Sequence, residues 1–138
     1  MLGRALLTIN GAAQMLGPFI ADFNHTHVKN PRWPPHAKFH NGQTMSMGLS
    51  LGLLTLYYTH RRNVNVEAQR ENLFTAMVLG SLYWVTGLSA VLYPGSLAVD
   101  PEFGEGFPQF WLFVGLWACA VVGWGLEIWG LEGRKKNV

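Results

Sequence analysis

Four apolar stretches, separated by polar segments, run along the chain at residues 5–21, 44–59, 73–93 and 107–131. The last two are longer than the roughly 20 residues that cross a bilayer as a helix, and the first two are shorter. The two shorter helices can span a thinner bilayer, or they can span one of ordinary thickness if aromatic or long basic side chains anchor their ends. We therefore predict an all-α fold, an integral membrane four-helix bundle that forms a single transmembrane domain over residues 1–138.

The composition supports a membrane protein. Only 13% of the residues are charged, against roughly 25% in ordinary soluble domains. Cys119 is the single cysteine, so the chain has no intrachain disulfide and no cysteine cage for a metal. The basic residues lie at the ends of the apolar stretches and not on one continuous face, which argues against nucleic acid as a partner.

The distribution of Lys and Arg predicts the orientation. The N-terminus, the second polar segment and the C-terminal tail carry seven basic residues, and the first polar segment carries three. The positive-inside rule then places both termini in the cytosol. The last four residues include Lys135 and Lys136 and have the form of a di-lysine retrieval signal. We therefore expect a multi-pass protein of the endoplasmic reticulum membrane.

The His-rich segment 22–43, which we expect to form a lumenal loop, is the most promising place for chemistry. It contains four of the five histidines, and its three prolines make it stiff. Asp22 is its only carboxylate, and a carboxylate at a membrane boundary has a perturbed pKa that suits an acid or a base. Histidine titrates near neutral pH. The predicted catalytic residues are Asp22, His27, His36 and His40.

Polar side chains continue from this segment along the neighbouring helices. Asn10 and Gln14 share a helix face with Asp22, and His40, Gln43, Met47 and Ser50 follow a similar spacing. Two such faces would line a cavity that binds an apolar small molecule, unless the amides only form hydrogen bonds between helices. With aromatic residues added, the predicted substrate-binding residues are Asn10, Gln14, His25, Trp33, Asn41, Gln43, Tyr83 and Trp117.

A metal site is the competing interpretation of the histidines. His25 with His27, and His36 with His40, have spacings that metal ligands use. The basic side chains of the same segment would repel a divalent cation. We therefore expect acid–base chemistry without a metal or another cofactor.

The residues between the first two apolar stretches also resemble a known family. Asp22, His27, Asn30-Pro31, the run Trp33-Pro34-Pro35-His36-Ala37 and His40 are similar to the signature of small four-span fungal membrane proteins. The nearest functional relatives of that family look like the small membrane epoxide hydrolases and cyclases of fungal natural-product pathways. The resemblance implies that Asp22, oriented by His27, activates water or a substrate hydroxyl, or attacks directly, while His36 or His40 protonates the epoxide oxygen.

Two other functions stay open at this point. One is a double-bond isomerase or sterol-binding protein similar to the emopamil-binding family, although the glutamates that such proteins carry within their spans are missing here apart from Glu127. The other is a noncatalytic membrane partner of pathway enzymes. A homodimer that pairs through Gly48 and Gly52, or through Gly123, is a further expectation.

Overall fold

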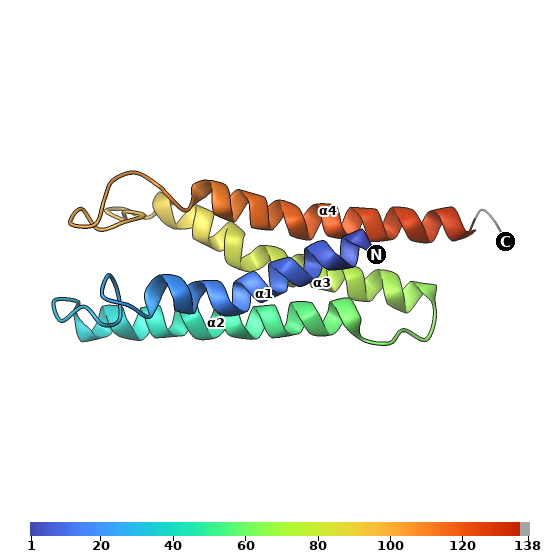
Figure 1. The fold of residues 1–138 in the computed structure, drawn as a ribbon, viewed down its shortest axis with the longest axis horizontal. Helices are drawn as coiled ribbons and strands as arrows, with labels where there is room; N and C mark the ends of the chain where they lie inside the picture. The colour runs from blue at the N-terminus through green and yellow to red at the C-terminus, as the bar shows by residue number, and fades with distance from the viewer. Residues whose placement is uncertain (136–138) are drawn as a thin grey trace.

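The computed structural model describes residues 1–135, and this part of the chain is all-helical, without a strand. Four long helices run side by side along one elongated bundle, and each packs against its two neighbours in the cyclic order α1, α2, α3, α4 (Figure 1). The elements are α1 (Leu2–Asp22), α2 (Pro35–His60), α3 (Val66–Ser89) with the short 3-10 turn η1 (Ala90–Leu92), and α4 (Phe110–Lys135). The all-α part of the prediction is confirmed. Lys136, Asn137 and Val138 of the proposed retrieval signal lie outside the described residues.

The helices extend beyond the apolar stretches that predicted them. α2 begins at Pro35, nine residues before Thr44, so only residues 23–34 of the expected loop 22–43 lie outside helices. Proline is favoured in the first turn of a helix, where its missing N–H is not needed. α3 begins at Val66 because the side chain of Asn65 accepts a hydrogen bond from the backbone N–H of Ala68. A hydrophobic run thus predicts the apolar part of a helix but not the residue at which the helix begins.

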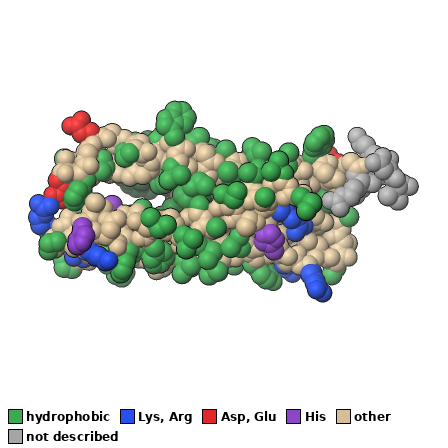
Figure 2. All heavy atoms as spheres, in the orientation of Figure 1, with side chains coloured by type: hydrophobic (Ala, Val, Ile, Leu, Met, Phe, Trp, Pro, Cys, Tyr) green, Lys and Arg blue, Asp and Glu red, His purple; other side chains and the backbone are tan. Residues whose placement is uncertain are grey.

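Two helices are long and apolar enough to cross a membrane: α3 with η1, and α4 up to Gly133. α1 and α2 are less hydropathic because they carry polar residues, and several of these polar residues point inward. Asn10, Gln14 and Thr55 have no exposed surface, whereas Ile9 and Leu16 are more than half exposed. Hydrophobic side chains accordingly cover much of the visible surface along the bundle (Figure 2).

Polar contacts tie the buried centre of the bundle together. The Nδ2 of Asn10 donates to the carbonyl oxygen of Leu116 at 2.6 Å, which joins α1 to α4. The Nε2 of Gln14 donates to the carbonyl oxygen of Gly80 at 3.0 Å, which joins α1 to α3. The hydroxyl of Thr55 donates to the Oε1 of Gln14 at 3.3 Å and adds α2. Such bonds hold helices together where water is absent.

Glycines let α1 approach its neighbours closely. A Cβ added to Gly52 would lie 2.4 Å from the carbonyl oxygen of Gly11, and one added to Gly123 would lie 2.8 Å from that of Gly3. A Cβ at Gly48 would lie 2.8 Å from the carbonyl oxygen of Gln14. These glycines, which the sequence offered as a dimerisation surface, are therefore occupied by helix contacts within the chain.

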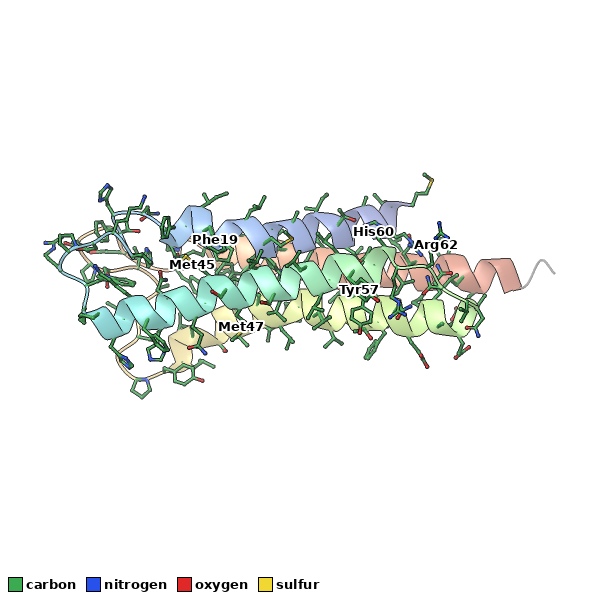
Figure 3. All side chains as sticks on the ribbon, turned by 90° about the horizontal axis from the view of Figure 1, so that it is seen from below. Phe19, Met45, Met47, Tyr57, His60 and Arg62 are labelled. Carbon is green, nitrogen blue, oxygen red and sulfur yellow. The ribbon has the colours of Figure 1, made fainter. Side chains whose placement is uncertain are left out.

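The end of the bundle opposite the His-rich segment is closed by a charged contact. Glu127 of α4 is buried, and its Oε1 accepts a hydrogen bond from the backbone N–H of Arg4 at 3.2 Å. The Nε of Arg4 lies 3.5 Å from the other carboxylate oxygen, and its Nη1 donates to the carbonyl oxygen of Thr59. Glu127 thus meets the positive end of the α1 dipole. His60 and Arg62 lie at this same end (Figure 3).

Candidate functional site

Asp22 is the last residue of α1, and two side chains flank its carboxylate. The Nδ2 of Asn41, on the second turn of α2, donates to one carboxylate oxygen at 2.9 Å. The Nε2 of His27 lies 3.8 Å from the other oxygen. This distance is too long for a direct hydrogen bond, but it allows one water or hydroxyl to contact both groups. Asn41 thus fixes the carboxylate and leaves one oxygen facing the imidazole.

A short relay of hydrogen bonds orients the ring of His27. The hydroxyl of Thr26 donates to the Oδ1 of Asn24 at 2.7 Å, and the hydroxyl oxygen of Thr26 lies 2.6 Å from the Nδ1 of His27. Because the hydroxyl proton is used on Asn24, Nδ1 must be the donor in the second bond. The Nε2 of His27 is then free to take or give a proton on the side of Asp22.

Burial and hydrogen bonding act on Asp22 in opposite directions. Burial is the larger effect and raises the pKa of the carboxyl above its usual value of 3.8, while the charge of His27 and the hydrogen bond from Asn41 partly offset it. A carboxyl with a raised pKa is a stronger base once it is ionised. This is the property that a group needs to take a proton from water or from an alcohol.

Asp22 and His27 line a hollow of about 270 Å³ at this end of the bundle. Its other walls come from the segment between α3 and α4, including Val99 and Phe103, and from Gln109 just before α4. Val99 and Phe103 thus lie beside the two titratable groups, and Asp100 adds a second carboxylate to the wall. The hollow offers an acid and a base next to an apolar surface, which suits a small molecule of low polarity.

The polar segments 23–34 and 93–109 contact one another over this end of the bundle, and we call these contacts the clasp. The Nε1 of Trp33 donates to Asp100 at 3.1 Å, and the ring of Trp33 meets that of His27 edge-on, with 4.8 Å between centroids. Arg32 forms an ion pair with Glu102. The contacts hold the segment 23–34 against the segment 93–109, and Trp33 passes this restraint on to His27.

The structure separates His36 and His40 from Asp22. Their Nε2 atoms lie 3.0 Å apart on the exposed side of α2, and the Nδ1 of His40 is 3.4 Å from the Oε1 of Gln43. Asn41 lies on the buried side because it is one residue, or about 100°, further round the helix. The stripe that runs through His40, Gln43, Met47 and Ser50 is likewise not the buried face of α2, which instead carries Met45, Gly48, Gly52, Thr55 and Thr59.

The remaining candidates are distributed over the bundle. The side chains of Asn10 and Gln14 form the interhelical hydrogen bonds described above. His25 and Trp117 are exposed. Tyr83 lines a neighbouring hollow between α2 and α3 and lies within electrostatic reach of Asp22. The structure therefore brings together, at or beside one hollow, the predicted residues Asp22, His27, Trp33, Asn41 and Tyr83.

Sequence reasoning missed three parts of this site. Thr26 and Asn24 orient His27, and the only signal was that they stand directly beside it in the sequence. Gln109 lines the hollow and donates to the carbonyl oxygen of Ala98 at 2.9 Å. Gln109 is the only residue with a side-chain amide in the segment 93–109, and this was the only sequence signal that distinguished it.

No cluster of three or more metal-binding side chains occurs among residues 1–133, whose side chains the structure describes. The pair of His36 and His40 stands without a third ligand of this kind within that range. The chemistry that the described site can perform with its own residues is proton transfer between Asp22, His27 and a molecule bound beside them.

Comparison with known proteins places the chain in a family. A model of a family of unknown function, DUF6640, matches residues 6–137. The chain belongs to the DUF6640 family. No curated protein and no solved structure matches it. In this DUF6640 protein the matched region contains all four helices almost entirely, and with them every residue of the site around Asp22.

Proposed function

We propose that this DUF6640 protein is a membrane-embedded acid–base enzyme that opens an epoxide on an apolar small molecule, by hydrolysis or by cyclisation. The observation that supports this most directly is the pair of Asp22 and His27. The two groups lie 3.8 Å apart on the wall of a hollow that apolar side chains such as Val99 and Phe103 also line. Epoxide opening needs a base for the nucleophile and an acid for the departing oxygen, held on one substrate at the same time.

The proposed reaction uses the two groups in opposite protonation states. Ionised Asp22 takes a proton from water, or from a hydroxyl of the substrate, as that oxygen attacks an epoxide carbon. The carbon–oxygen bond of the ring breaks, and protonated His27 donates its Nε2 proton to the released oxygen. The proton on Asp22 then returns to His27. The product is a diol or a cyclic ether, and no oxidant or reductant is required.

Asn41 and Thr26 have positioning roles in this scheme. Asn41 donates to Asp22, which keeps one carboxylate oxygen turned toward His27. Thr26 holds the Nδ1 proton of His27, so Nε2 is the atom that exchanges protons with the substrate. Direct attack by Asp22 through an ester intermediate is the other route that these residues allow.

The membrane setting is part of the same proposal. We infer four spans with both termini in the cytosol, residence in the endoplasmic reticulum, and kinship with the fungal epoxide-opening enzymes that the His-rich segment resembles. The exposed apolar side chains of all four helices, such as Ile20 and Leu54, support four spans. Asp22 and His27 would then lie at the lumenal boundary, with access to water on one side and to lipid on the other.

The test is turnover of apolar polyene epoxides by membranes that contain the protein, in water labelled with heavy oxygen. We expect a labelled diol, or an unlabelled cyclic ether if an internal hydroxyl attacks. Asp22→Asn should abolish either product. The matched control is Glu105→Gln, since Glu105 is exposed and does not line the hollow. Full turnover by Asp22→Asn, or no conversion of any epoxide by the unmodified protein, would contradict the proposal.

A further inference from the structure

Two more hollows adjoin the one that contains Asp22. The first, of about 220 Å³, lies beneath η1 and is bounded by apolar side chains such as Leu97 and Phe113. It shares Ala98 and Gln109 with the hollow of Asp22. The second, of about 270 Å³, lies between α2 and α3, and it shares Gly87 and Ala90 with the hollow beneath η1. The shared walls make the three hollows neighbours in a row.

The volumes indicate how these hollows are used. Each is smaller than the lower bound of roughly 300 Å³ that is usual for sites of small organic ligands. Taken together they exceed that bound. A molecule of ordinary metabolite size that reaches Asp22 therefore extends beyond this hollow, and the other two offer it further apolar surface.

The outermost hollow lies on the side of the bundle between α2 and α3. Thr44 and Met47 of α2 form one edge, and Tyr83 and Thr86 of α3 form the other. Met47 is half exposed, and Tyr83 and Thr86 belong to the helix that is long and apolar enough to cross a membrane. The opening between the upper and lower helix pairs at this end of the bundle is visible in Figure 2. One end of the row of hollows thus lies on the side of the bundle, and the other end, at Asp22, lies at its polar end.

Small side chains lie where the two outer hollows meet. A Cβ added to Gly87 would lie 2.6 Å from the ring of Phe113, so no larger residue fits between these two hollows without moving that ring. Ala90, the other shared residue, presents only a methyl group. The narrow point between the outer hollow and the hollow beneath η1 is therefore formed by the two smallest side chains of the region.

We propose that the slit between α2 and α3 is the substrate entrance, and that it admits an elongated amphiphile directly from the bilayer. The apolar chain of this molecule occupies the outer hollow and the hollow beneath η1, and its oxygen-bearing end reaches Asp22 and His27. This inference rests on the proposed function and adds the class of substrate. Rigid, compact or strongly polar epoxides are excluded by the apolar walls and the narrow point.

Photolabelling tests the entrance without requiring turnover. The probe is 1,2-epoxyhexadecane with a diazirine in mid-chain, dissolved in phosphatidylcholine vesicles that contain the full chain. After illumination, mass spectrometry should find the label on residues of the two outer hollows, above all Met47, Ala90 and Leu97. Label spread evenly over the lipid-facing surface, or confined to α1 and α4, would overturn the proposal.

A pair of variants in η1 supplies the matched control. Ala90→Phe places a ring at the narrow point, and because Ala90 is exposed, the larger side chain does not disturb the buried core. We expect labelling inside the hollows to fall about tenfold. Leu92→Phe changes a residue two positions away that lines neither hollow, and it should label as the unmodified chain does. Equal labelling of the two variants would refute the entrance.

The outcomes separate this inference from the proposed function. Label in the outer hollows without conversion of the epoxide would support the entrance and contradict the enzyme. Conversion in Ala90→Phe at the rate of the unmodified chain would support the enzyme and contradict the entrance.

Discussion

Gly52→Ala should destabilise the bundle, although the same change stabilises most helices. Replacing glycine by alanine inside a helix contributes about 1 kcal/mol through lower backbone entropy in the unfolded chain. At Gly52 the new methyl carbon would lie 2.4 Å from the carbonyl oxygen of Gly11 and 2.5 Å from the Cγ of Met15. A carbon in contact with a carbonyl oxygen normally keeps about 3.3 Å. The methyl group is therefore roughly 0.9 Å too close, and one contact is with backbone that cannot rotate away.

The helices must separate to make room, and overpacking of this kind costs about 1–3 kcal/mol. After the gain in helix propensity, we expect a net loss of about 1 kcal/mol. The site should respond as well, because the distance between α1 and α2 sets the hydrogen bond from Asn41 to Asp22. We expect the rate of epoxide opening to fall along with stability.

The assay is reversible unfolding in detergent micelles, with Gly17→Ala as the matched control. Gly17 also lies in a helix of this bundle, but a Cβ there meets no other atom within 4 Å. Gly17→Ala should therefore be at least as stable as the unmodified chain. If Gly52→Ala and Gly17→Ala shift stability equally and in the same direction, the close approach of α1 and α2 does not exist in the protein.

Three further changes test other parts of the structure. Asn41→Ala removes a hydrogen bond that lowers the pKa of Asp22, so the acid limb of the pH–rate profile should move to higher pH; a limb that stays in place would remove Asn41 from the site. Gln14→Leu deletes the bonds to α3 and leaves Thr55 without its acceptor, and it should lower the free energy of unfolding in micelles by about 1–2 kcal/mol. Trp33→Phe keeps a ring against the imidazole but removes the N–H donor, so hydrogen exchange in residues 93–109 should rise about fivefold, as expected for one lost hydrogen bond; unchanged exchange would mean that the clasp carries no stability.

The pattern of the sequence predicted the number and order of the helices but not their ends. Hydrophobic runs identify the part of a helix that faces lipid or core, and the turns beyond it are specified by other signals. Pro35 and Asn65 supplied such signals here, a first-turn proline and a side-chain cap. Because the apolar stretch begins only at Thr44, hydrophobicity does not predict that the turn with Asn41 is helical.

The pairing of Asp22 with His27 was predictable because the two residues are close in sequence. Asp22 and His27 are five positions apart, and the fold places them on the same hollow. His36 and His40 have the same chemistry but point to the exposed side, because helical register separates them from Asn41. Asp100, Glu102 and Gln109 reach the site from a segment that no periodicity in the sequence connects to the first loop.

The contact between Arg4 and Glu127 constrains the order in which the molecule can assemble. The first helix is anchored by a carboxylate of the last helix, and Gly3 and Gly123 bring the two backbones together at the same point. A growing chain produces α1 long before Glu127 is synthesised. The backbone N–H of Arg4 therefore has no carboxylate partner until α4 has been made. The contact between the first and last helices therefore forms only after α4 has been made, and a chain stopped before α4 has no partner for Arg4 at this point.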